Sequence, residues 1–308
     1  MTSMLHLSTS PHIHSGRSTT KIMLDVIIAL LPTTVAGCII FGLRSLGVIA
    51  TCVLTCVICE FLFNLIIKKE QTVKDLSAVV TGLLLALNLP ANIPLWQAAV
   101  GSIFAIVVVK CIFGGIGKNL VNPAITARAF MIISFGSMVT PAFPKADTVS
   151  SATPLAVMAD GGSVELVDLF LGNHGGAIGE VCALALLIGG IYLLVRKVIT
   201  WHIPVVFIGG VFVFSFLFGG FDAIFSLQQV LAGGLLIGAI FMATDYVTSP
   251  SSAWGKIIFA SGAAFLTVVL RFWAGYPEGV SFAILLMNIL NPYIESIPGR
   301  KLFGGKKA

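Results

Sequence analysis

The stretch FAIVVVKCIFGG at residues 104–115 recurs later in the chain as FLTVVLRFWAGY at residues 265–276. The two stretches align without a gap and pair Val107 with Val268, Val108 with Val269, Lys110 with Arg271, and Gly114 with Gly275. A second match in the same order pairs NLVNPAI from Asn119 with NILNPYI from Asn288. Two matches in one order indicate an internal duplication, with two related halves in one chain.

Composition assigns both halves to a membrane. Of the 308 residues, 57% are hydrophobic and only 10% are charged, and the mean hydropathy is +1.03. A soluble domain needs more polar surface than this to cover its core, so we expect an all-α integral membrane protein. Residues 1–21 are polar, and the apolar run that follows them is long enough to span a bilayer. We therefore expect no cleaved signal peptide.

Apolar runs of roughly spanning length divide the chain into about ten predicted transmembrane helices. They cover residues 22–43, 46–67, 76–89, 95–113, 121–138, 177–198, 203–219, 228–247, 257–273 and 280–297. Five helices per half give the two halves opposite orientations. The sequence thus predicts two inverted five-helix repeats, at 22–138 and 177–297.

The third helix of each predicted repeat runs into polar, helix-breaking sequence. These stretches are ALNLPANIP around Asn88 and Pro90, and MATDYVTSPSS around Asp245 and Pro250. Irregular backbone at membrane depth is tolerated only against protein or a cavity. We therefore expect broken third helices, with a candidate ligand position between them.

Basic residues are distributed unevenly over the predicted loops. A cytoplasmic N-terminus leaves Arg44, Lys145 and Arg271 on the outer side and places on the inner side Arg17, Lys21, Lys68, Lys69, Lys74, Lys118, Arg196, Lys197, Lys256, Arg300, Lys301, Lys306 and Lys307. By the positive-inside rule this bias predicts a multi-pass protein of the cell inner membrane, with cytoplasmic segments 1–21 and 298–308. The longest loop, 139–176, is then extracytoplasmic. The formal charge of +5 reports this orientation rather than a nucleic-acid partner.

The stretch DTVSSATPL at residues 147–155 is a polar segment within that loop. Thr153 precedes Pro154 and the helix-competent run LAVMA, so one sufficient interpretation is a helix cap in a solvated loop. The order Asp147, Ser150, Ala152, Thr153 also resembles the flavin-acceptor motif Asp-x-x-Ser/Thr-Gly-Ala-Thr/Ser. In this chain Ser151 stands at the glycine position of that motif.

The likeness extends over nearly the whole chain. The blocks that carry it are SPHIHS, IMLDVIIALLP, VVTGLLLALNLP, FAIVVVKCIFGGIGKNLVNPAITARAF, FMATDYVTSP, EGVSFAILLMNILNP and GRKLFGG. Together they resemble the D subunits of Rnf electron-transport complexes, a family related to the B subunits of sodium-pumping NADH:quinone reductases.

The resemblance implies a covalent cofactor. A flavin transferase would esterify FMN through its phosphate to Thr153, with Asp147, Ser150, Ser151 and Ala152 as its recognition sequence. A phosphate on the residue before Pro154 would also lie at a helix N-terminus, so capping residue and cofactor anchor can be one residue. Some relatives hold a second, non-covalent flavin such as riboflavin, which no motif of this chain places.

The family passes electrons from reduced ferredoxin towards NAD, coupled to export of sodium ions or protons. This chain would be one flavin relay among the other subunits of a lipid-embedded complex. The nicotinamide and iron-sulfur sites would belong to partners, and the chain has neither a GxGxxG between strand and helix nor a CxxC cluster. The competing hypothesis is a small-solute permease or channel, because inverted repeats with broken helices also serve transport. A structural scaffold is a third.

Several ionisable residues fall in the apolar runs, where such groups need a partner or a cavity. Asp25, Glu60 and Asp245 are ion-path candidates, although pairing with Lys110 or Arg128 explains the first two equally well. Arg128 is a candidate contact for flavin phosphate or ring, with interhelical packing as the alternative.

Cysteine and histidine do not predict a metal site. All six cysteines lie in apolar runs and are interpreted as small hydrophobic residues. His6, His12 and His14 are expected in a cytoplasmic segment that covers the bundle or meets a partner protein of the complex.

Overall fold

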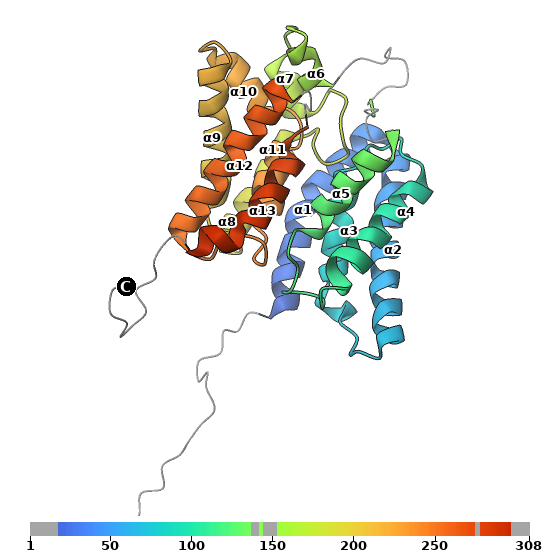
Figure 1. The fold of residues 1–308 in the computed structure, drawn as a ribbon. Coiled ribbons are helices and arrows are strands. Elements are labelled where there is room, and N and C mark those ends of the chain that lie inside the picture. The colour runs from blue at the N-terminus through green and yellow to red at the C-terminus, as the bar shows by residue number, and fades with distance from the viewer. Residues whose placement is uncertain (1–17, 137–141, 144–152, 275–277, 297–308) are drawn as a thin grey trace, which may run out of the picture.

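The computed structural model of the chain describes residues 18–136, 142–143, 153–274 and 278–296 (Figure 1). These residues form helices and loops, with one isolated antiparallel bridge between Ala142 and Gly176. The predicted all-helical class is therefore confirmed for this part of the chain.

The first half of the chain forms one bundle, coloured blue to green in Figure 1. Its elements are α1 (Thr19–Phe41), α2 (Leu43–Ile67), the 3-10 helix η1 (Val73–Asp75), α3 (Ser77–Leu87), α4 (Leu95–Ile103), the π-helix η2 (Phe104–Cys111) and α5 (Pro123–Ser134). α2 packs along both α3 and α4, and α5 packs against η2.

The second half forms the bundle that is yellow to red in Figure 1. Its elements are α8 (Ala183–Val195), α9 (His202–Phe218), α10 (Ala223–Leu231), α11 (Leu235–Ile237), the π-helix η4 (Gly238–Met242), α12 (Ala253–Trp273) and α13 (Val280–Ser296). α12 packs along α9 and α13, and α8 packs along α1 of the first bundle. The α1 and α8 contact thus joins the two halves.

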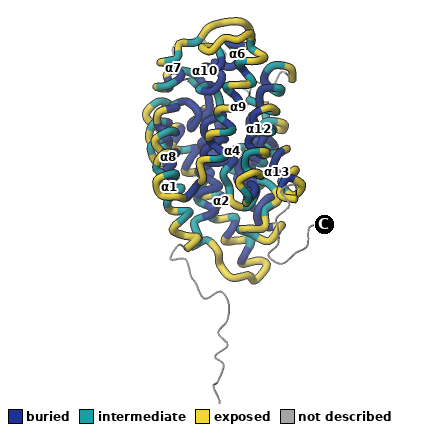
Figure 2. Tube along the Cα trace, turned by 90° about the vertical axis from the view of Figure 1, so that its left-hand side faces the viewer, coloured by how far each residue is buried: buried dark blue, intermediate teal, exposed yellow. Residues whose placement is uncertain are grey.

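Two short helices, α6 (Pro154–Ala159) and α7 (Leu166–Leu171), lie between the halves in sequence and at the upper end of the molecule in Figures 1 and 2. The start of α1 and the end of α13 both lie at the lower end in Figure 1. The ends of the described chain are therefore on the side opposite α6, the same-side arrangement that the charge pattern predicts.

The outer surface of the helices is apolar. Ile39 is 77% exposed, Ile66 is 78% exposed and Val195 is 74% exposed, and yellow segments run along the flanks in Figure 2. Large apolar surface of this kind suits lipid rather than water. Among the described helices, α1, α2 and α12 are each long and apolar enough to cross a membrane, and α10 with α11 and η4 forms a fourth candidate span, bent by 66°.

The chain is thus a multi-pass membrane protein. The other apolar helices have 10–17 residues, so the number of ten spans stays a prediction.

Both predicted breaks occur where the sequence places them, because the chain leaves helical conformation after Leu87 and again after Met242. A third break was not predicted. The expected helix 228–247 is interrupted between Leu231 and Leu235, where Gly233 has φ of +68°, a conformation that other residues rarely adopt.

The second sequence match does not mark equivalent positions. Asn122 caps the N-terminus of α5, whereas Asn291 lies inside α13, four residues beyond Met287. The internal duplication therefore stays a prediction. The first match does place its two cations alike, since Lys110 and Arg271 each lie near the C-terminal end of their helical segment and are both buried.

The halves meet closely at their centre. Asn122 donates its Nδ2 hydrogen to the carbonyl oxygen of Met242 at 3.2 Å, and the backbone N–H of Gly179 donates to Leu87 at 2.7 Å. Glycine permits such approaches, since a Cβ at Gly179 would lie 2.6 Å from the Cβ atom of Leu87. These contacts satisfy broken backbone in the middle of the molecule.

Candidate functional site

The residue singled out by the sequence, Thr153, lies at the N-cap of α6. Its hydroxyl oxygen accepts a hydrogen bond from the backbone N–H of Ala156 at 3.3 Å, and Pro154 takes the first helical position. The predicted capping role is therefore confirmed. The other proposed motif residues, Asp147, Ser150, Ser151 and Ala152, lie outside the described residues.

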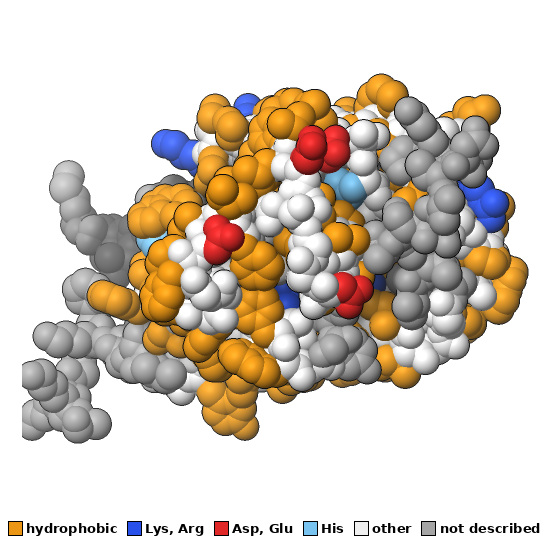
Figure 3. Space-filling model, turned by 90° about the horizontal axis from the view of Figure 1, so that it is seen from above, with side chains coloured by type: hydrophobic (Ala, Val, Ile, Leu, Met, Phe, Trp, Pro, Cys, Tyr) orange, Lys and Arg blue, Asp and Glu red, His pale blue; other side chains and the backbone are white. Residues whose placement is uncertain are grey.

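Thr153 lines a small cavity of about 10 Å³ together with His174, Gly233, Glu180 and Glu278. This volume holds about one water molecule, so a larger group attached to Thr153 must extend beyond the cavity. Seen from above, the same end of the molecule shows acidic side chains and histidine among apolar ones, with Lys and Arg mostly at its edges (Figure 3).

The two ring nitrogens of His174 differ in their hydrogen bonding. Its Nδ1 lies 3.1 Å from the carbonyl oxygen of Gly175, while its Nε2 is buried without a hydrogen-bond partner among the described residues. The pKa of the His174 side chain lies below its ordinary value of 6.5, mainly because burial disfavours the charged imidazolium.

A buried charge cluster lies below the cavity. The Arg128 guanidinium is 3% exposed and places Nη1 2.5 Å from Glu180 Oε1 and Nη2 2.5 Å from Glu278 Oε2. Nη1 also donates to Asn88 Oδ1 at 2.6 Å. The cluster joins α5, the end of α3 and two loops of the second half. It holds those elements together and leaves Arg128 little capacity for a ligand.

A second buried guanidinium lies beside the unpredicted break. Arg271 donates from Nη1 to the carbonyl oxygen of Gln229 at 2.5 Å and from Nη2 to that of Ala232 at 3.1 Å. It forms no ion pair with any described carboxylate. Its side chain thus satisfies carbonyl groups at the end of α10 and keeps its charge.

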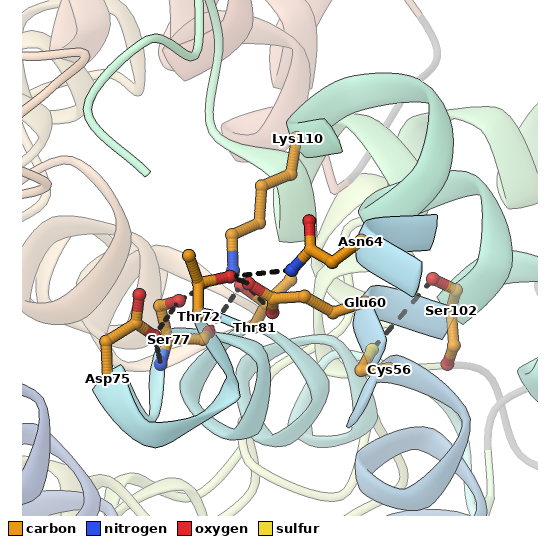
Figure 4. Close-up of polar contacts among 9 residues, drawn as sticks. All are labelled: Cys56, Glu60, Asn64, Thr72, Asp75, Ser77, Thr81, Ser102 and Lys110. Atoms are coloured by element: carbon orange, nitrogen blue, oxygen red, sulfur yellow. Dashed lines mark hydrogen bonds and ion pairs between the residues drawn. The ribbon is translucent and has the colours of Figure 1, made fainter. Parts of the chain in front are cut away.

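The lower end of the first bundle contains a different polar network (Figure 4). Lys110 Nζ donates to Glu60 Oε2 at 2.8 Å and to Ser77 Oγ at 2.6 Å, and both charged side chains are 2% exposed. Thr72 donates to the other Glu60 oxygen at 2.6 Å. Every charge in this network has a partner, as the pairing alternative for Glu60 predicts.

The remaining ion-path candidates, Asp25 and Asp245, lie in different parts of the molecule. Asp25 lies near the surface, where Tyr192 donates to it at 3.0 Å and Arg196 pairs with it at 3.2 Å. Asp245 lines a cavity of about 360 Å³ between the halves, together with Lys110. Thr248 donates to the Asp245 carboxylate at 3.2 Å. The structure therefore does not bring Asp25, Glu60 and Asp245 into one cluster.

Sequence reasoning missed His174, Glu180, Glu278 and the Gly233 break. Glu180 carried a usable signal, since it is a lone acid in the apolar sequence AIGEVCALAL. The other three stand in polar or glycine-containing loops, where single residues of these types are common.

The upper cavity fits an esterified phosphate in one specific respect. A phosphate oxygen is a strong hydrogen-bond acceptor, and the side chain of His174 lines the same cavity as Thr153. Because its Nδ1 faces the Gly175 carbonyl oxygen, His174 donates from Nε2 only as the imidazolium, the form that an adjacent phosphate favours. The carboxylates of Glu180 and Glu278, which would repel an anion, are both paired with Arg128.

Comparison with known proteins identifies the relatives of this chain. The NQR2, RnfD, RnfE family matches residues 6–304. The D subunit of the Na(+)-translocating ferredoxin:NAD(+) oxidoreductase complex of Acetobacterium woodii is 46% identical over 98% of this chain and 96% of its own length. The proton-translocating counterpart of Clostridium ljungdahlii is 40% identical, with the same coverage. The D subunit of the ion-translocating oxidoreductase complex of Stutzerimonas stutzeri is 37% identical over 93% of this chain and 92% of its own.

The family match runs from residue 6 in the polar N-terminal segment to residue 304 in the closing GRKLFGG block. The chain therefore belongs to the NQR2, RnfD, RnfE family.

Proposed function

We propose that this chain is the flavin-carrying membrane component of an ion-translocating ferredoxin:NAD oxidoreductase complex. In this proposal FMN is bound as a phosphoester to Thr153 and relays electrons between partner subunits. The observation that supports it most is the position of Thr153, which lies half-buried at the upper end and lines a small cavity together with His174. Two relatives over nearly the full chain carry names of such complexes, and a third is named as a subunit of an ion-translocating oxidoreductase complex.

In this proposal the cofactor carries out the electron transfer, and the protein side chains bind and position the cofactor. Bound FMN supplies electron transfer, and attachment through the phosphate leaves its ring unmodified. Thr153 fixes the phosphate to α6, and His174 in its imidazolium form donates from Nε2 to the phosphate, because its Nδ1 faces the carbonyl oxygen of Gly175. The Arg128 guanidinium pairs with both Glu180 and Glu278 and so reduces the repulsion that these carboxylates exert on the anion.

The proposal includes an orientation and a repeat architecture. The end that bears α6 faces the extracytoplasmic side of the inner membrane, and ten spans form two inverted repeats. In support, the start of α1 and the end of α13 both lie at the opposite end (Figure 1). A flavin transferase acts on the loop before Thr153, and the other subunits of the complex cover the apolar flanks together with lipid.

Asp245 is the proposed ion ligand with the best access, because it lines the large cavity between the halves. Glu60 and Asp25 are already paired with Lys110 and Arg196. The names of the first two relatives specify different ions, sodium in one and protons in the other. Sodium dependence of transport by the purified complex is the measurement that assigns the ion.

A permease is the second candidate function. The cavity of about 360 Å³ that Lys110 and Asp245 line between the halves favours it, because such a volume accommodates a small solute. A permease needs no flavin on Thr153, so cofactor content separates the two candidates.

The test is flavin fluorescence of the denatured chain on a gel after coexpression with the flavin transferase. We expect fluorescent wild type and Thr153→Ser bands, since a serine hydroxyl also forms the ester, and a dark Thr153→Val band. Ser252→Ala is the matched control, because Ser252 caps α12 by accepting from Gly255 N–H at 3.0 Å. A fluorescent Thr153→Val band or a dark wild-type band contradicts the proposal.

A further inference from the structure

A larger cavity lies on the other side of Leu155 from Thr153. It measures about 330 Å³, and α6 supplies part of its wall through Leu155, Met158 and Ala159. Leu155 also lines the small cavity that contains Thr153. One helix therefore presents the proposed attachment point and the wall of a chamber with the volume of a small-molecule site.

Aromatic side chains line the rest of this chamber. The rings of Phe225 and Phe272 are nearly parallel, with centroids 6.0 Å apart, and those of Phe218 and Trp273 meet edge to face at 5.3 Å. Such flat, polarisable surfaces favour a flat aromatic guest, which stacks on them or meets their edges. We call this chamber the aromatic cavity.

The polar atoms of the aromatic cavity are hydrogen-bond donors. Arg271 is 7% exposed, and its Nε has no partner among the described residues. The only described acceptor for the Gln229 amide nitrogen is the sulfur of Met158 at 3.9 Å, a weak one. The Gln229 oxygen already lies 3.2 Å from Arg271 Nη1. The chamber thus offers donors without competing acceptors.

We propose that the aromatic cavity holds the isoalloxazine ring of the flavin on Thr153, with Arg271 and Gln229 facing the carbonyl and nitrogen acceptors of the ring. This inference rests on the proposed function and assigns Arg271, rather than Arg128, as the guanidinium that serves the cofactor. Both guanidinium groups have an unpartnered Nε, but Arg128 is ion-paired with two carboxylates, whereas no described carboxylate lies within ion-pair distance of Arg271.

The route from attachment point to ring is short. A Cβ at Gly233 would lie 2.6 Å from the Leu155 side chain and 3.6 Å from Arg271 Nη2. Gly233, Leu155 and Arg271 are therefore in one contact group between the two cavities. A lipid chain is the competing guest, but it makes no use of a buried cation and an amide donor.

A fixed positive charge next to the ring has a measurable consequence. It stabilises the more electron-rich, reduced flavin and so raises the reduction potential. We expect Arg271→Gln to shift the reduction equilibrium about tenfold towards the oxidised form, ~30 mV for a two-electron couple. Arg271→Lys retains the charge and should shift it less.

The experiment compares full-length variants purified with the native complex. Intact mass gives FMN loading, visible circular dichroism reports the ring environment, and spectroelectrochemistry gives the midpoint potential. Arg44→Gln is the charge control, since Arg44 is an exposed arginine that donates to the carbonyl oxygen of Asn92. Ala159→Trp fills the cavity from an exposed position on α6, and Val157→Trp adds the same bulk outside the cavity wall.

Three results are distinguishable. Loaded variants with a lower potential in Arg271→Gln and altered dichroism in Ala159→Trp, but not in the two controls, support the ring site. Loaded variants that all match wild type overturn the ring site and leave the FMN ester on Thr153 intact. A wild-type chain of bare polypeptide mass overturns both. If Arg271→Gln does not fold, the Ala159→Trp and Val157→Trp pair still decides between the first two results.

Discussion

Lys110 in the lower network and Arg271 in the upper site occupy aligned sequence positions, but the two buried cations have different partners. Both cations are buried near the end of a helical segment. Lys110 pairs with Glu60, whereas Arg271 contacts only carbonyl oxygens and the Gln229 side chain. The two aligned positions thus hold a closed ion pair in one half and, in the other, a cation beside a cavity with no described carboxylate within ion-pair distance.

The difference shows how a repeat can acquire a function in one half only. A fully paired buried network fixes helices and has no capacity left for a ligand. An unpaired buried cation is tolerated where carbonyl dipoles, or a guest with acceptor atoms, compensate its charge. The proposed flavin site therefore lies at the upper cation, near Thr153.

The largest expected effect is the loss of the lower ion pair. Lys110→Met leaves the Glu60 carboxylate buried without its cation, which should lower the free energy of unfolding by about 3–5 kcal/mol. Thermal unfolding in detergent measures this. The double variant Lys110→Met/Glu60→Met should recover most of the loss, and a double variant as unstable as the single one would show that the pair is not the cause.

Removal of Arg128 should have a slightly smaller effect. Arg128→Met leaves two carboxylates without a partner, but Glu278 is 34% exposed and can be hydrated. We expect a loss of about 3 kcal/mol, with flavin loading intact in the surviving folded protein. Unchanged stability would contradict the structural role, and a selective loss of flavin would return Arg128 to the cofactor site.

Thr153→Val should have a small effect on stability and a complete effect on cofactor content. Loss of an N-cap hydroxyl lowers the free energy of unfolding by about 1 kcal/mol. Ser252→Ala, which removes the α12 cap, should lower it by a similar amount with flavin retained. Equal flavin content in both variants would mean that Thr153 is only a cap.

The smallest effect concerns the pH dependence of the upper end. Burial lowers the pKa of His174 in the folded chain, so the unfolded chain takes up a proton more readily. The bare chain should therefore lose stability as the pH falls below about 6.5, the ordinary histidine pKa. Chemical denaturation at several pH values measures this, with His174→Gln as the control without the dependence.

Loading with FMN should weaken this dependence, because a phosphate next to His174 favours its charged form. A loaded chain with the same pH dependence as the bare chain would place the phosphate elsewhere.

The sequence predicted those features that are local. Apolar runs predicted α1, α2 and α12 within a few residues, and Pro and Asn predicted the ends of the third helices. The Thr153 cap followed from the Thr-Pro pair. The break at Gly233 was not predicted, because glycine is also common at helix packing contacts in membranes and does not by itself indicate a break.

Contacts between residues far apart in the chain could not be predicted from the sequence. Arg128 pairs with Glu278, 150 positions away, and only the packing of α5 against α13 brings them together. The same holds for the aromatic cavity, whose walls come from α6, α9, α10 and α12. The repeat aligned Lys110 with Arg271 but contained no information on which of them is paired.

The most direct measurement for the account is the intact mass of the full chain isolated in its complex from the native host, with the Thr153→Val chain beside it. The account predicts one FMN phosphoester on wild type, mapped by fragmentation to Thr153, and an unmodified Thr153→Val chain. Two unmodified chains, or a flavin mapped to another residue, would contradict it.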